Sequence, residues 1–86
     1  MKLKENFVFR EIAGETVVVP VGEGIDLDKM FVLNETGRFL WGLLKQETDE
    51  AALVAALLSE YEVEASMAKR HVAAFIDQLK EYDFLA

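Results

Sequence analysis

Cysteine is absent from this 86-residue sequence, and histidine occurs only once, as His71. The chain therefore forms no disulfide bond, has no thiol nucleophile and offers no cysteine ligand to a metal. His71 has no nucleophile or set of metal ligands at local spacing, and we interpret it as a packing or surface residue. Ser59 and Ser66 likewise lack a nearby base and are interpreted as surface or capping residues. We expect no catalytic residue, no bound metal and no cofactor.

Long hydrophobic runs are missing too. No stretch approaches the roughly 20 apolar residues that cross a bilayer, and the first six positions, 1–6, have charge but no apolar signal-peptide core behind them. The five glycines form no phosphate-binding pattern, and the GxG at 22–24 stands between two expected strands rather than before a helix. We therefore expect a cytoplasmic protein that has no membrane partner and binds no nucleotide.

Positive charge is scarce, because nine Lys and Arg stand against sixteen Asp and Glu and leave a formal net charge of −7. A nucleic-acid module usually presents a basic face, since neutralising phosphates supplies much of its affinity. The cations of the last expected helix, Lys69, Arg70 and Lys80, are balanced there by Asp77 and Glu81. The charge balance counts against DNA or RNA as the partner.

Hydrophobic residues, in contrast, make up 52% of the chain and predict a packed core. A chain of this length has room for one such core, so we expect residues 1–86 to form a single domain. The N-terminal part is rich in β-branched and aromatic residues, and its only tight-turn signal is at Gly14. It predicts strands at 7–12, 16–20 and 30–33.

The character of the chain changes at 31–41, where a short apolar strand runs directly into a helix. Asn34 has a side-chain oxygen that can accept from a backbone N–H two or three residues on, as a helix N-cap does. Glu35 follows in the first turn, where the helix dipole favours a carboxylate. Trp41 is interpreted as a half-buried packing residue. Apolar residues at helical spacing then cluster on one face: Phe39, Leu40, Leu43 and Leu44.

Helical spacing continues to the C-terminus, in segments at 35–46, after Thr48 as an expected cap, and at 65–82. We expect the tail residues Phe84 and Leu85 to fold back onto the body. A three-stranded antiparallel N-terminal sheet followed by three helices predicts an α+β fold of winged-helix-like type. The apolar face of the last helix is predicted to hold Ala68, Val72, Phe75, Ile76, Leu79 and Tyr82.

The sequence at 33–41, Leu-Asn-Glu-Thr-Gly-Arg-Phe-Leu-Trp, followed by Leu43 and Leu44, resembles the PqqD family, named for a protein of pyrroloquinoline quinone biosynthesis. The resemblance covers about residues 7–85, and its most specific part is Leu-Asn-x-Thr-Gly-x-x-Leu-Trp. Asp83 stands where many relatives have a glycine before the terminal apolar pair. The family pattern continues through the later helices at Asp49, Leu53, Leu57, Leu58, Tyr61, Glu62, Val63, Val72, Phe75 and Leu79.

The resemblance implies a peptide-binding module that is not an enzyme. Members of this family bind the leader segment of a ribosomally made precursor peptide and present its core to a modifying enzyme, often a radical S-adenosylmethionine protein. The resemblance also implies that the leader adds as a strand to the third strand and lies against the third helix.

A short edge strand is compatible with that function, because strand addition requires unpaired backbone groups. On the third strand the predicted peptide-binding residues are Met30, Phe31, Val32 and Leu33. On a helical wheel of the third helix, a strip of residues starts at Ile76 on the core face and continues to Lys69, Ala73 and Lys80. These four residues are the predicted peptide-binding residues of this helix. That strip suits an extended peptide with apolar anchors and some acidic character. The opposite margin is the alternative wall, with Met67, His71, Ala74 and Gln78.

Other interpretations stay open. Ile76 can belong to the core alone, with Lys69 and Lys80 as a solvated flank. The chain as a whole can be a winged-helix DNA-binding regulator, or a structural or oligomerisation subunit. The DNA-binding alternative needs a recognition helix with several exposed cations, which the mixed charges of the last helix do not favour. Genes for a small peptide and a radical enzyme beside this one would favour peptide binding.

Overall fold

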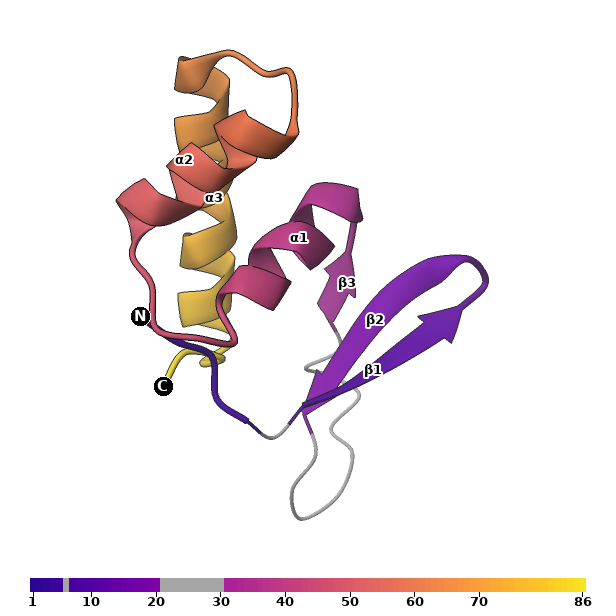
Figure 1. The fold of residues 1–86 in the computed structure, drawn as a ribbon. Coiled ribbons are helices and arrows are strands. Elements are labelled where there is room, and N and C mark those ends of the chain that lie inside the picture. Colours follow the sequence, from indigo (N-terminus) through magenta and orange to yellow (C-terminus); the bar gives the residue numbers. More distant parts are fainter. Residues whose placement is uncertain (6, 21–30) are drawn as a thin grey trace.

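Three strands precede three helices, in the order that the sequence predicts. The structure is a computed structural model, and it describes residues 1–5, 7–20 and 31–86 (Figure 1). Met30 and the GxG at 22–24 therefore lie outside the described residues. The α+β fold class and its winged-helix-like layout are confirmed. The elements are β1 (Phe7–Ile12), β2 (Glu15–Pro20), β3 (Phe31–Leu33), α1 (Glu35–Leu43), α2 (Glu50–Glu60) and α3 (Ala65–Glu81).

The strands form one antiparallel sheet in the order β1-β2-β3. The register pairs Phe9 with Val18 across the hairpin, and Val18 in turn with Phe31 of β3. These residues share one face of the sheet, and Val18 is fully buried. Figure 1 shows the β1–β2 hairpin extending away from the helices, with β3 leading into α1. The third strand is therefore at an edge of the sheet, beside the helices.

The hairpin turn, Ala13-Gly14, places both central residues at positive φ, with Ala13 at 53° and Gly14 at 82°. This backbone suits Gly, which has no Cβ, and Asn, whose side chain can hydrogen-bond locally, whereas most other L-residues are strained there by about 1–2 kcal/mol. We expect Ala13→Asn to raise the free energy of unfolding by about 0.5–1 kcal/mol, measured by urea denaturation. Gly14→Ala is the matched control and should lower it. Destabilisation by Ala13→Asn would contradict this description of the turn.

Each of the first two helices begins at a side-chain cap. Asn34 Oδ1 accepts from the backbone N–H of Gly37 at 2.8 Å, which confirms the predicted cap of α1. The cap of α2 is Asp49, whose Oδ1 accepts from the N–H of Ala52 at 2.7 Å, so the assignment to Thr48 was wrong. The backbone N–H of Thr48 instead donates to the carbonyl of Met1 at 3.0 Å.

The ends of α1 and α3 come earlier than the apolar spacing predicts. Helix α1 ends at Leu43, because the carbonyl of Leu44 accepts from the backbone N–H of Leu3 at 2.9 Å rather than from a later turn. Helix α3 ends at Glu81, and Asp83 follows with a left-handed φ of 60°. A glycine at this position would take this backbone without strain.

The core lies between the sheet and the helices, and it includes a cluster of aromatic rings around Phe84. Phe84 is 1% exposed and forms edge-to-face contacts with Phe7, Phe31 and Trp41 at centroid distances of 4.7–5.8 Å, which confirms that the tail folds back. Trp41 is 2% exposed, so it is a core residue rather than a half-buried one. Leu3 bridges to Leu85, which brings both termini together (Figure 1).

None of the helices in the described part of the chain has the length and apolar character needed to cross a bilayer.

Candidate functional site

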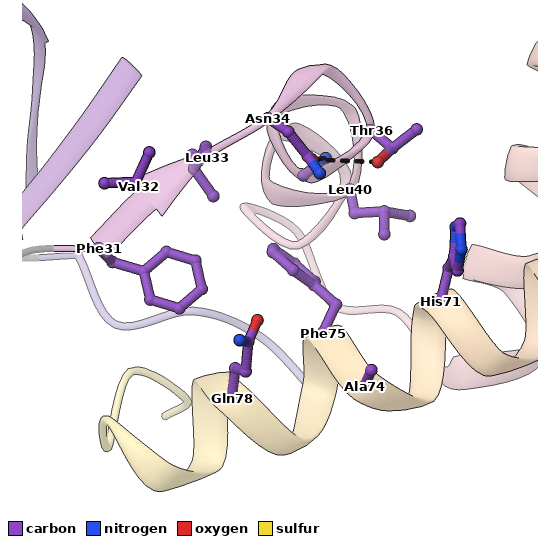
Figure 2. A pocket seen from close by; sticks show the side chains of 11 residues that line it. Phe31, Val32, Leu33, Asn34, Thr36, Leu40, His71, Ala74, Phe75 and Gln78 are labelled. Atoms are coloured by element: carbon purple, nitrogen blue, oxygen red, sulfur yellow. Dashed lines mark hydrogen bonds between the residues drawn. The ribbon is translucent and has the colours of Figure 1, made fainter. Parts of the chain in front are cut away.

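A pocket of about 240 Å³ lies between β3 and α3, below the start of α1 (Figure 2). Strand β3 and the cap residue supply one wall, with Phe31, Val32, Leu33 and Asn34. Helix α3 supplies the facing wall, with His71, Ala74, Phe75 and Gln78. The start of α1 closes the space between them with Thr36, Gly37 and Leu40. The pocket thus follows the length of β3.

The floor of the pocket is apolar and its rim is polar. Phe31, Leu40 and Phe75 are at most 8% exposed, and the rings of Phe31 and Phe75 meet edge to face at 6.1 Å. Asn34 and Gln78 are exposed at the rim, on opposite sides (Figure 2). Apolar surface with a few polar groups around it is typical of sites that recognise a ligand.

The outer edge of β3 adjoins this pocket. Strand β3 pairs with β2 on one side, and within the described residues no strand pairs with its other side. Val32, in the middle of β3, is 51% exposed. An open strand edge presents backbone N–H and C=O groups to which an extended peptide can pair. Edge and pocket together provide backbone pairing and side-chain recognition in one place.

Gly37 is the residue that lets α1 approach this site closely. A Cβ added there would lie 3.1 Å from Asn34 Oδ1 and 3.3 Å from Leu33 Cδ2, both tighter than ordinary contacts. A side chain at this position would therefore push the helix away from the cap and from β3. Thr36 and Gly37, the Thr-Gly of the Leu-Asn-x-Thr-Gly motif, therefore shape the end of the pocket beside α1. The sequence alone did not indicate this function.

The structure brings only part of the predicted site together. Phe31, Val32 and Leu33 line the pocket as a group, whereas Met30 lies outside the described residues. None of the four predicted α3 residues is in the lining, and Ile76 is 3% exposed in the core. Peptide contact with Lys69, Ala73, Ile76 and Lys80 thus stays a prediction.

Three residues of the alternative margin, His71, Ala74 and Gln78, do line the pocket. Met67, the fourth, is exposed but is not in the lining. The sequence did not indicate five of the lining residues as site residues: Asn34, Thr36, Gly37, Leu40 and Phe75. The signal that could have found the first four is the Leu-Asn-x-Thr-Gly-x-x-Leu motif, which predicts a cap, a helix start and the family resemblance but was not assigned to the site.

A second hollow, of about 330 Å³, lies beside β1 and the N-terminal segment. Its walls include Phe7, Phe9 and Trp41, and the ammonium group of Lys45 lies 5.1 Å from the centre of the Phe9 ring. It is not beside the open edge of β3. Within the described ranges, no group of three or more His, Asp and Glu side chains is placed to hold a metal ion.

Fold and site define a class: a small α+β domain with a recognition pocket beside an open strand edge. The chain belongs to the family of the coenzyme PQQ synthesis protein D, whose model matches residues 15–85.

Two solved structures are similar over nearly the whole chain. One is TbiB1 in complex with the TbiA(beta) leader peptide, with 26% identity, a TM-score of 0.75, and coverage of 99% of this chain and 94% of that one. The other is a lasso peptide synthetase B1 complexed with the leader peptide, with 28% identity, a TM-score of 0.69, and coverage of 93% and 89%. A comparison with curated proteins finds no match.

Proposed function

We propose that this chain is a non-catalytic module that captures the leader segment of a precursor peptide and presents the peptide to a modifying enzyme. The observation that carries the proposal is the open edge of β3 beside an apolar pocket. The two similar structures support it, because both are complexes with leader peptides. A radical S-adenosylmethionine protein is the modifying enzyme that the family resemblance suggests.

In this proposal the leader pairs with Phe31–Leu33 as an added strand, and its inward side chains contact α3. A three-residue strand is about 10 Å long. On α3, the wall from His71 to Gln78 covers a rise of seven residues along the helix axis, which is also about 10 Å. Strand and helix therefore match in length, and the paired part of the leader is roughly three to four residues.

The chemistry of the pocket lining also indicates which kind of leader side chain binds there. The pocket floor is apolar, so at least one apolar leader side chain anchors there. The lining residues include no Asp, Glu, Lys or Arg. We therefore propose that apolar contact and backbone pairing, rather than charge, supply most of the affinity, in contrast to the acidic leader that the lysine-bearing strip would suit.

Titration calorimetry tests this function. The probes are the TbiA(beta) leader peptide and synthetic leader segments of small peptides encoded beside this gene, each with a scrambled control. We expect one of the leader segments to bind in a 1:1 complex, with an affinity that changes little between low and high salt, since surface charges contribute little. Failure of every leader segment to bind more tightly than its scrambled control would refute the proposal.

A further inference from the structure

Asn34 lies where the edge of β3 meets α1, and its side chain lines the pocket (Figure 2). Its Oδ1 accepts from the backbone N–H of Gly37 at 2.8 Å and from Thr36 Oγ1 at 3.1 Å. Because a backbone N–H can only donate, the amide atom facing Gly37 must be the oxygen. The nitrogen, Nδ2, therefore lies on the other branch of the amide, and it has no hydrogen-bond partner among the described residues.

Capping alone does not require an amide. In the same chain Asp49 caps α2 with the same spacing and nearly the same distance, 2.7 Å from Oδ1 to the N–H of Ala52. Asp is as good an N-cap as Asn, and its charge is favoured by the helix dipole. What Asn34 adds, compared with Asp49, is a pair of N–H donors at a pocket rim.

Few backbone N–H and C=O groups on the outer edge of β3 are available to pair with a peptide. Consecutive residues of an antiparallel strand direct their backbone groups to opposite sides, so β3, with three residues, presents the groups of one or two residues outward. The backbone is still extended at Asn34, with φ −81° and ψ −175°, but its carbonyl accepts from the N–H of Arg38 at 2.9 Å. Backbone pairing therefore ends at the position where the side-chain amide begins.

We propose that Asn34 has two functions: Oδ1 caps α1, while Nδ2 donates a hydrogen bond to a backbone carbonyl of the bound leader. This inference rests on the proposed function and adds a recognition residue to it. The side-chain amide then continues the open edge of β3 by one donor. A backbone carbonyl has two lone pairs, so the contact fits any leader sequence and fixes its register rather than its side chains.

Asn34→Asp tests the inference, because Asp keeps the shape and the cap and replaces the donor by an acceptor. Calorimetry with a leader peptide that the wild type binds should show a loss of affinity of about 10-fold or more, with an unchanged melting temperature. Gln46→Glu is the matched control, since the same amide-to-carboxylate change is made at an exposed residue outside the pocket lining. It should bind as the wild type does.

Asn34→Ser separates the donor from the new charge, because Ser also caps helices but is neutral and shorter. It should lose about 3- to 10-fold in affinity. In the wild type, the side-chain NH₂ resonances of Asn34 should move downfield when the peptide is added. Wild-type affinity of Asn34→Ser, or NH₂ resonances that do not move, would overturn the inference while leaving peptide binding intact. Absence of leader binding by the wild type would instead refute the function.

Discussion

Replacing Leu40 with Ala is expected to lower the free energy of unfolding by about 2–5 kcal/mol. Leu40 is 2% exposed, belongs to the buried core cluster and also lines the floor of the pocket, so the truncation removes a buried aliphatic side chain and its packing contacts there. A domain of this size has a total stability of only about 5–15 kcal/mol, so the loss is a large part of it. Urea denaturation can be followed by the fluorescence of Trp41, which is buried in the same core.

Leu43→Ala is the matched control for this prediction. The apolar spacing placed Leu40 and Leu43 on the same buried face, but Leu43 is only half-buried at the edge of the core. Its truncation opens toward solvent, and we expect a loss of about 1 kcal/mol. Equal losses for the two variants, or a loss below about 0.5 kcal/mol for Leu40→Ala, would contradict the described core.

The second large effect is expected for Ala74→Glu, which should weaken leader binding by about 100-fold or more. Ala74 is exposed on α3 and lines the pocket between His71 and Gln78. A longer, charged side chain there would fill the space and would lose its hydration against an apolar floor when the peptide binds. Because Glu is a good helix former at an exposed position, the melting temperature should change little. Calorimetry with the leader peptide measures the effect.

Ala73→Glu provides the comparison, with the same substitution one residue earlier. Ala73 is half-buried and is not in the pocket lining. We expect this variant to keep its affinity for the leader, provided that its melting curve shows a folded protein. If Ala73→Glu blocks binding and Ala74→Glu does not, the peptide lies on the margin with Lys69 and Lys80, as the helical wheel predicted.

The sequence predicted what depends on local pattern. β-branched and aromatic residues predicted the strands. The side chain of Asn34 predicted the start of α1, because capping needs only residues close in sequence. The early end of α1 could not be predicted. It depends on the hydrogen bond from Leu3 to the carbonyl of Leu44, which joins parts far apart in the chain.

Which margin of α3 lines the pocket could not be predicted from the sequence either. A helical wheel locates the core face, and Val72 and Leu79 are indeed fully buried. The wheel does not give the side on which β3 lies, because the two margins are mirror positions about that face. The packing of Phe31 of β3 against Phe75 puts His71 and Ala74 in the pocket lining and leaves Lys69 and Ala73 outside it.

The floor of the pocket is made of core side chains, and this has a practical consequence. Phe31, Leu40 and Phe75 belong both to the pocket lining and to the buried cluster. This pocket exists only in the folded chain, so a leader that binds there stabilises the fold, and folding and capture are thermodynamically linked. At a free peptide concentration 100 times Kd, binding adds about 2.7 kcal/mol to the stability. In a domain of this size that is a rise in Tm of roughly 10–20 °C, so a thermal-shift screen of candidate peptides can find the natural ligand without any assay of the modifying enzyme.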